Sequence, residues 1–248
     1  MKLKIFGLLL FALVLSACGD DINTNLFSPE EYFEYARDLY LDEDYEQALR
    51  EFQSIILQYP GSTITDDTQY FLGMTYFKRE EFLLAAYEFS KLIRDIPASE
   101  FVPESQFMLA ESYYQLSPNY QLDQAYTKKA VEEYQAFIDF FPLDNKVEEA
   151  EKKINEMNIK LARKTYSNAY IYEKMEYTKA ALKYYDKVAS TYHDTEYAPQ
   201  ALYRKIKMNM DKNNTGEVLK DINSFLQKYP DDPNATELSE IEQELLGN

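Results

Sequence analysis

YFLGMTYFKREEFLLAAYEFSKLIRDIP, residues 70–97, carries the pattern that decides the fold. In this stretch Ala85 is followed four residues later by Phe89 and twelve residues later by Pro97. Nearly the same phrase recurs along the chain, at Ala48, Phe52 and Pro60; Ala130, Tyr134 and Pro142; Ala181, Tyr185 and His193; and Val218, Ile222 and Pro230. A unit of this size cannot bury its own apolar face, so we expect the copies to stack and share one core.

The internal pattern of each copy resembles the tetratricopeptide repeat, a pair of antiparallel helices. The copies are spaced 37 to 51 residues apart, near the roughly 34 residues of that repeat plus insertions. Leu72, Gly73 and Tyr76 fall on the expected first helix, and Ala85 and Phe89 fall on the second. Small residues allow the paired helices to approach, and the aromatic residues fill the seam. We therefore predict an all-α, tetratricopeptide-like solenoid of about five repeats.

Local signals place several boundaries. Ser28-Pro29-Glu30-Glu31 predicts a capped helix start, and Ser117-Pro118-Asn119 predicts an inserted loop in the third repeat. The segment from 144 to about 174 lacks Pro and Gly and has an apolar residue every three or four positions. It predicts a long helix that links repeats three and four. The fifth repeat is degenerate, with Lys205, Ile206 and Asn209 in place of Leu, Gly and Tyr, and a last amphipathic helix is expected after Pro233.

The first residues predict that the protein is targeted to a membrane. Lys2 and Lys4 precede an apolar run too short to span a bilayer. The run ends Leu-Ser-Ala-Cys at Cys18, which resembles a bacterial lipobox. The resemblance implies a signal peptide over 1–17, diacylglycerol and an N-acyl chain on Cys18, and a lipidated linker over 18–27. Repeats one to three then occupy 28–143, and the long helix with repeats four and five occupies 144–248.

Composition argues against several function classes. The formal charge of −17 would repel nucleic acid, whose binding depends on cations placed on phosphates. The chain has one His and one Cys, so it lacks the pairs needed for nucleophilic catalysis and the clusters that hold zinc. His193 stands where the other repeats have proline and is expected to be a turn residue. We predict no catalytic residues, no metal and no cofactor apart from the lipid.

The first helices of repeats one to three are expected to line a concave groove. Aromatic side chains recur at two of the three groove positions in each repeat. Such rings, with an adaptable methionine, suit an extended peptide with aromatic side chains, and a cation would suit its terminal carboxylate. The alternative is that the rings pack repeat against repeat. The predicted groove residues are Phe33, Arg37, Tyr40, Tyr70, Met74, Phe77, Lys78, Phe107 and Tyr114.

Taken together, the lipobox, the repeats, the insertion and the long helix resemble the BamD family, lipoproteins of the outer-membrane β-barrel assembly (BAM) machine. The most specific matches are Leu122-Asp123-Gln124, Leu161-Ala162 and Tyr192-His193-Asp194-Thr195, where the family usually has Tyr-Pro-Asp-Thr. The resemblance implies a periplasm-facing, outer-membrane-anchored scaffold. Its N-terminal repeats would receive unfolded outer-membrane proteins through the aromatic-ended signal of their last strand. Its C-terminal repeats, within 169–229, would dock on the POTRA domains of a BamA-like insertase, beside other BAM lipoproteins.

Two other functions fit the same architecture. One is a tetratricopeptide lipoprotein that coordinates cell-envelope or division proteins, although the short stretch between Cys18 and Ser28 leaves no room for an oligomerising coiled coil. The other is a glycan-capturing lipoprotein. Sugar platforms favour Trp, and the chain has none among its 248 residues, although Tyr can substitute.

Overall fold

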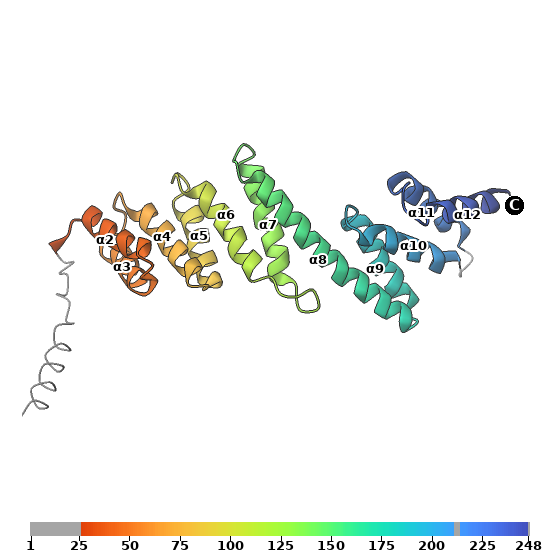
Figure 1. Cartoon of the computed structure of the whole chain (residues 1–248), viewed down its shortest axis with the longest axis horizontal. Coiled ribbons are helices and arrows are strands. Elements are labelled where there is room, and N and C mark those ends of the chain that lie inside the picture. The colour runs from red at the N-terminus through yellow and green to blue at the C-terminus, as the bar shows by residue number, and fades with distance from the viewer. Residues whose placement is uncertain (1–25, 211–213, 248) are drawn as a thin grey trace, which may run out of the picture. The chain divides into compact units, whose positions relative to one another are not determined.

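The computed structural model describes residues 26–210 and 214–247, and within these ranges every regular element is a helix. Consecutive helices run antiparallel as pairs (Figure 1), which confirms the all-α prediction. In chain order they are α2 (Pro29–Leu41), α3 (Tyr45–Gln58), α4 (Thr65–Lys78), α5 (Phe82–Asp95), α6 (Val102–Gln115), α7 (Ala125–Phe140), α8 (Val147–Lys174), α9 (Thr178–Thr191), α10 (Tyr197–Met210), α11 (Thr215–Lys228) and α12 (Ala235–Gly247).

The predicted boundaries follow from local capping. At the start of α2 the Ser28 hydroxyl accepts from the Glu31 amide at 3.2 Å, and the Glu31 carboxylate accepts from the Ser28 amide at 2.9 Å. This reciprocal pair is the predicted capping box. Residues 116–124 form the predicted loop between α6 and α7, and α8 is the predicted long helix of 28 residues. At about 1.5 Å per residue α8 is roughly 42 Å long.

Three of the turns inside the helix pairs share one conformation. Glu43, Glu80 and Glu176 have positive φ angles of 63°, 62° and 61°. At the second of these, the Glu81 amide donates to the Tyr76 carbonyl at 2.9 Å, which closes the last turn of α4. This left-handed cap favours glycine, so each glutamate carries a local conformational cost.

Small residues let the paired helices approach closely. Ala48, Ala85, Ala130 and Ala181, the first members of four copies of the repeated phrase, are all fully buried. On α4, a Cβ added to Gly73 would lie 2.7 Å from Cε1 of Phe89. The ring therefore occupies the space that a larger side chain at Gly73 would need.

Tyrosine–glutamate hydrogen bonds recur along the chain and help to explain why it uses 23 tyrosines. The ring packs among apolar neighbours while the hydroxyl donates to a carboxylate at the margin of the core. Three of these pairs, with their oxygen–oxygen distances, are Tyr32–Glu51 (2.6 Å), Tyr114–Glu156 (2.8 Å) and Tyr203–Glu237 (2.9 Å). Two more are Tyr185–Glu173 and Tyr134–Glu111.

The chain divides into two compact units, Met1–Leu72 and Gly73–Asn248, with the division inside α4. The predicted subdivision at residue 144 lies within the second unit and stays a prediction. In the described part of the second unit, α10, α11 and α12 enclose one apolar cluster around Ile222 and Phe225. Helices α8, α9 and α10 enclose another around Tyr185 and Val188.

The predicted signal peptide, the lipidation site Cys18 and most of the predicted linker lie outside the described residues. None of the described helices combines the length and the apolar character needed to cross a bilayer.

Candidate functional site

In the first unit, the predicted groove side chains meet at the ring of Phe71. Phe33 is 5% exposed, and its ring centroid lies 5.7 Å from that of Phe71 and 6.1 Å from that of Phe52. Tyr40 and Tyr70 are half-buried, with centroids 5.4 Å and 5.5 Å from Phe71. Phe33 therefore packs between Phe52 of its own helix pair and Phe71 on the first helix of the next pair, as the packing alternative expects. Tyr40 and Tyr70 keep part of their rings open to solvent.

Arg37 is partly exposed and already has two partners on its own helix. Its guanidinium forms an ion pair with Glu34, three residues earlier, and its Cζ lies 6.0 Å from the ring centroid of Phe33. An exposed pair of this kind contributes little to stability, because water screens both charges. The guanidinium could therefore exchange Glu34 for an incoming carboxylate at small cost.

In the second unit, the rest of α4 supplies three predicted residues. Met74 and Phe77 are half-buried, and the Phe77 ring centroid lies 5.2 Å from that of Phe82 at the start of α5. Lys78, the last residue of α4, is exposed. A cation in the last turn also complements the negative end of the helix dipole.

The two predicted residues of α6 differ in accessibility. Phe107 is 4% exposed, with ring centroids of Tyr134 and Phe137 at 5.7 Å and 5.4 Å. Tyr114 is half-buried. Its hydroxyl donates to Glu156 at 2.8 Å, and this hydrogen bond, with burial, raises the pKa of Tyr114 to about 12.

Polar contacts join α6 to α8 at a nearly constant separation along the sequence. Lys146 pairs with Glu104 and Lys153 pairs with Glu111, each 42 residues apart. Lys160 donates to the Ser117 hydroxyl at 2.8 Å, 43 residues away. The Glu111–Lys153 pair is mostly buried, with 11% and 17% of the side chains exposed. These contacts fix the register of α8 on α6 and on the start of the loop that follows α6.

Sequence reasoning did not single out this seam, although a signal for it exists. Opposite charges stand one repeat apart at matching positions of α6 and α8, as at Glu104 and Lys146 or at Glu111 and Lys153. Comparing charges across the repeat period would have predicted the contacts. The contact between neighbouring first helices is the repeat-against-repeat packing that the alternative for Tyr114 and Phe107 expects.

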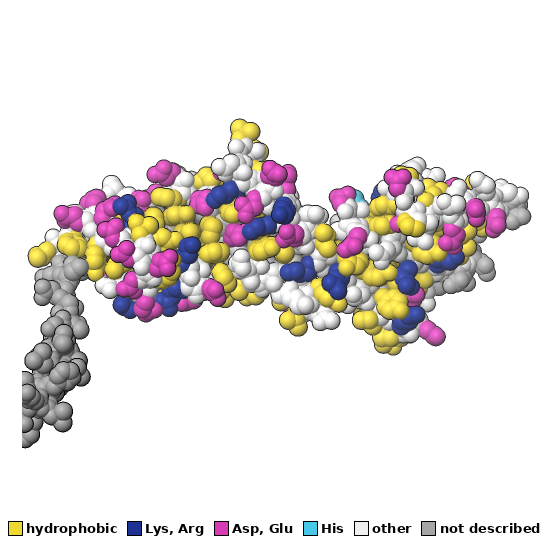
Figure 2. Space-filling view, in the orientation of Figure 1, with side chains coloured by type: hydrophobic (Ala, Val, Ile, Leu, Met, Phe, Trp, Pro, Cys, Tyr) yellow, Lys and Arg dark blue, Asp and Glu magenta, His cyan; other side chains and the backbone are white. Residues whose placement is uncertain are grey.

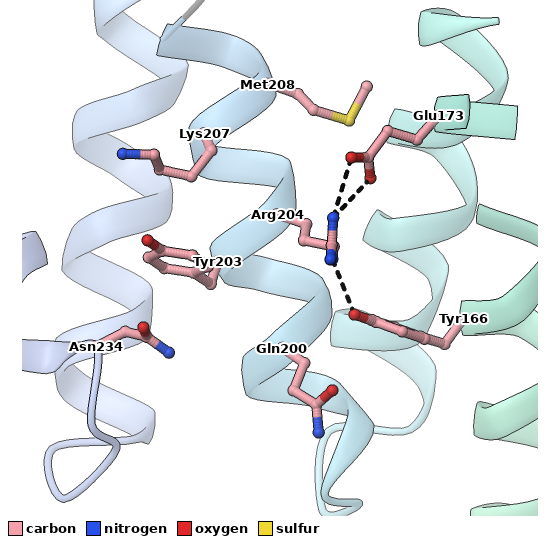
Figure 3. Close-up of a pocket in the computed structure, with 8 residues that line it drawn as sticks. All are labelled: Tyr166, Glu173, Gln200, Tyr203, Arg204, Lys207, Met208 and Asn234. Atoms are coloured by element: carbon pink, nitrogen blue, oxygen red, sulfur yellow. Dashed lines mark hydrogen bonds and ion pairs between the residues drawn. The ribbon is translucent and has the colours of Figure 1, made fainter. Parts of the chain in front are cut away.

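The C-terminal repeats contain an open pocket of about 380 Å³ that sequence reasoning also did not locate. It lies between α8, α10 and the start of α12 (Figure 3). From α10, Arg204 points toward α8, whereas Tyr203 lies on the side of Asn234. The lining residues are Tyr166, Glu173, Gln200, Tyr203, Arg204, Lys207, Met208 and Asn234.

The two cations of this pocket have different surroundings. Arg204 donates to the Tyr166 hydroxyl at 2.9 Å and to Glu173 at 3.0 Å, and its Cζ lies 5.0 Å from the Tyr170 ring centroid. Burial lowers the pKa of Arg204, but its hydrogen bond to Tyr166 and the Glu173 charge outweigh burial and leave the pKa raised. Lys207 is 44% exposed and pairs with Glu237 at 3.2 Å. Lys207 is thus the more available charge.

A protein-family model described as "YfiO: Outer membrane lipoprotein" matches residues 27–216, which is more than half of the chain. This chain belongs to the YfiO outer membrane lipoprotein family. The match begins beside the first described residues and ends at the start of α11. The chain is also similar to a curated protein of Rickettsia prowazekii (strain Madrid E), "Outer membrane protein assembly factor BamD". The identity is 25% over 206 residues, which are 82% of each chain. These matches confirm the predicted resemblance.

Solved structures similar to this YfiO-family chain include two tetratricopeptide proteins. A thermophilic protein of Thermus thermophilus is 15% identical, with 89% of this chain and 100% of that one covered and a TM-score of 0.38. The TPR2AB domain of yeast Sti1 is 13% identical, with 88% and 84% covered and a TM-score of 0.43. The paired antiparallel helices of the described residues form a tetratricopeptide-like helical solenoid, as the repeated phrase predicts.

Proposed function

We propose that this chain is a non-enzymatic scaffold of the outer-membrane β-barrel assembly machinery, anchored to the outer membrane through lipid on Cys18 and facing the periplasm. It binds unfolded outer-membrane proteins and a BamA-like, POTRA-containing insertase. The observation that carries the proposal is the family match over residues 27–216, together with the similarity to an outer membrane protein assembly factor. The half-buried aromatic side chains on α2, α4 and α6 and the pocket of the C-terminal repeats support the two binding roles.

The substrate contact is assigned to side chains that keep accessible area. Tyr40, Tyr70, Phe77 and Tyr114 are half-buried, whereas Phe33 and Phe107 are almost wholly covered by neighbouring rings. An aromatic residue at the end of a peptide would pack on the accessible rings. Its terminal carboxylate would pair with Arg37 on α2 or with Lys78 on α4.

A peptide-binding assay tests the substrate role. The probe is a synthetic peptide that ends in Phe with a free carboxylate, compared with the same peptide amidated. We expect the variant Tyr40→Ala with Phe77→Ala to bind about tenfold or more weakly, since a buried aromatic anchor commonly contributes about 2 kcal/mol or more. The matched control is Tyr87→Ala, because Tyr87 is 58% exposed on α5. Equal affinity of the double variant and the control would refute the aromatic contact.

The insertase contact is assigned to the C-terminal repeats, within 169–229. In the pocket between α8, α10 and α12, Lys207 is the accessible cation and would receive an acidic side chain of the partner. Replacing Lys207 by Glu reverses this charge and, because Glu237 lies beside it, also produces local repulsion. The exposed Lys128 of α7 lies outside 169–229 and provides a matched control, since Lys128→Glu changes the net charge equally.

A detergent pull-down of the tagged, full-length lipoprotein from its own membranes tests the assembly role directly. We expect a POTRA-containing insertase in near-equal amount, lost with Lys207→Glu and kept with Lys128→Glu. The peptide affinity of both variants should stay at the wild-type value. Recovery of division, peptidoglycan or glycan-uptake proteins in place of the insertase would overturn the assembly role and favour one of the two other functions.

A further inference from the structure

Residues 159–190 form a basic segment in an acidic chain. The segment holds seven Lys and Arg residues against three Asp and Glu, whereas the whole chain has a formal charge of −17. It comprises the second half of α8, the α8–α9 turn and nearly all of α9. In the described part of the chain, none of its seven cations pairs with a carboxylate.

The acidic residues of the basic segment do not neutralise it. Glu173 pairs with Arg204 of α10, and Asp186 pairs with Lys205 of α10. Only Glu176, in the α8–α9 turn, forms no ion pair in the described residues. The positive charge of the basic segment is therefore larger than its sequence count suggests.

Four of the cations project into solvent at the α8–α9 turn and along the exposed face of α9. Lys174 is the last residue of α8, with Nζ 5.1 Å from the Tyr170 ring centroid, and it is exposed. Lys179, Lys183 and Lys187 are exposed on α9 and recur every four residues. Residues at this spacing lie on one face of a helix. The remaining three cations, Lys160, Arg163 and Lys164, contact the inserted loop between α6 and α7. Lys164, for example, donates to the Leu122 carbonyl at 2.8 Å.

Apolar side chains are exposed beside these lysines. Ile171 is 54% exposed, Met175 53% and Tyr177 57%, all at the C-terminal end of α8 or in the turn that follows it. Figure 2 shows hydrophobic and basic side chains together where α8 ends and α9 begins, at the lower edge of this region of the view. Large apolar side chains gathered at an exposed tip indicate a contact surface.

We propose that this end of α8 and α9 rests on an anionic phospholipid surface. The lysines meet the phosphates, and Ile171, Met175 and Tyr177 enter the interfacial layer. Each basic residue held near an anionic membrane strengthens the attraction, and aromatic and aliphatic side chains add buried apolar area. The apolar side chains stand at a helix-pair end, which can lie against a flat surface. The family is one of outer membrane lipoproteins, so a phospholipid surface lies close to the chain.

The side chains of this proposed surface lie within 169–229, but none of them lines the pocket that contains Lys207 or belongs to the peptide groove. The proposal needs only the membrane location of the family, so it can fail while the assembly role stands, and the reverse also holds. Its physical consequence is orientation. A chain held by lipid at its N-terminus and by a second contact far along the sequence would present the same face of its repeats to partners.

Vesicle co-sedimentation tests the proposal with the chain from residue 19 onward, which keeps every described helix and lacks the acylated cysteine. The probes are vesicles of phosphatidylethanolamine with phosphatidylglycerol and vesicles of phosphatidylcholine alone. The test variant replaces Lys174, Lys179, Lys183 and Lys187 by Gln. The control variant replaces four other exposed lysines, so its net charge is identical: Lys128, Lys152, Lys220 and Lys228.

We expect the wild-type chain and the control variant to bind the anionic vesicles and the test variant to bind about tenfold or more weakly. Binding should also fall steeply as salt is raised, because screening shortens the reach of the charges. Met175→Asp with Tyr177→Asp should weaken binding with all four lysines in place. No binding by the wild-type chain, or equal losses in the test and control variants, would overturn the proposal. Urea unfolding of each variant checks that the fold is kept.

Discussion

Replacing Gly73 by Ala tests the close approach of α4 and α5 in the second unit. The new Cβ would lie 2.7 Å, 2.9 Å and 3.1 Å from three ring carbons of Phe89. Ordinary carbon contacts begin near about 3.5 Å, so the ring must move by several tenths of an ångström. Phe89 is fully buried among other core residues and has little room to do so.

The magnitude follows from two opposing effects. Overpacking a filled core costs about 1–3 kcal/mol. Alanine is favoured over glycine inside a helix by about 1 kcal/mol. We therefore expect Gly73→Ala to lower the free energy of unfolding by up to about 2 kcal/mol, measured as a lower urea midpoint. Gly216→Ala is the matched control, because nothing lies within 4 Å of its added Cβ, and we expect it to be neutral or stabilising.

A double-mutant cycle with Phe89→Leu identifies the cause. The branched aliphatic side chain removes the ring carbons that the new Cβ meets, so Gly73→Ala should become neutral or stabilising in that background. The reasoning is refuted if Gly73→Ala raises the urea midpoint in the wild-type chain as Gly216→Ala does. It is also refuted if the loss is the same in the presence and absence of the Phe89 ring.

Three further predictions concern a turn, a buried ion pair and a tyrosine. Glu80→Gly should raise the free energy of unfolding by up to about 1 kcal/mol, because φ is 62° at this residue and glycine adopts positive φ without strain. As a control, a glycine introduced at an exposed mid-helix position should lower the free energy of unfolding. Lys205→Met should destabilise by about 3–5 kcal/mol near pH 7, because it leaves the 5%-exposed Asp221 without its 3.0 Å partner. Burial raises the pKa of Asp221, and protonation removes the unpaired charge, so the loss measured by urea unfolding should shrink as the pH falls toward acid. The hydrogen bond to Glu156 raises the pKa of Tyr114 to about 12, above its ordinary value of 10. Its contribution to stability is therefore complete below about pH 10 and lost between about pH 10 and 12. Tyr114→Phe should remove this component from the alkaline unfolding profile; an unchanged profile would contradict the assignment.

The candidate site was predictable in part. Sequence spacing placed Tyr40 and Phe77 at matching positions of successive first helices, and both are half-buried. The same spacing placed Phe33 and Phe107 at positions that the structure nearly covers, with 5% and 4% exposed. Spacing states which face of a helix a residue occupies, but the sizes of the neighbouring side chains decide how much of that face stays open. The peptide contact itself remains a prediction.

The amino-acid sequence by itself determined the elements and their order. Helix caps, turns, prolines and the recurring small residues act within a few positions of themselves, so their spacing predicted the paired helices, the loop around Pro118 and the long α8. Only the tertiary structure decided which charged side chains form ion pairs and which are exposed to solvent. Lys153 is paired with Glu111 across 42 residues, Arg204 is held by Glu173, and Lys183 projects into solvent. Ion pairs depend on distances of a few ångströms between helices. Such distances are set by packing and not by position along the chain.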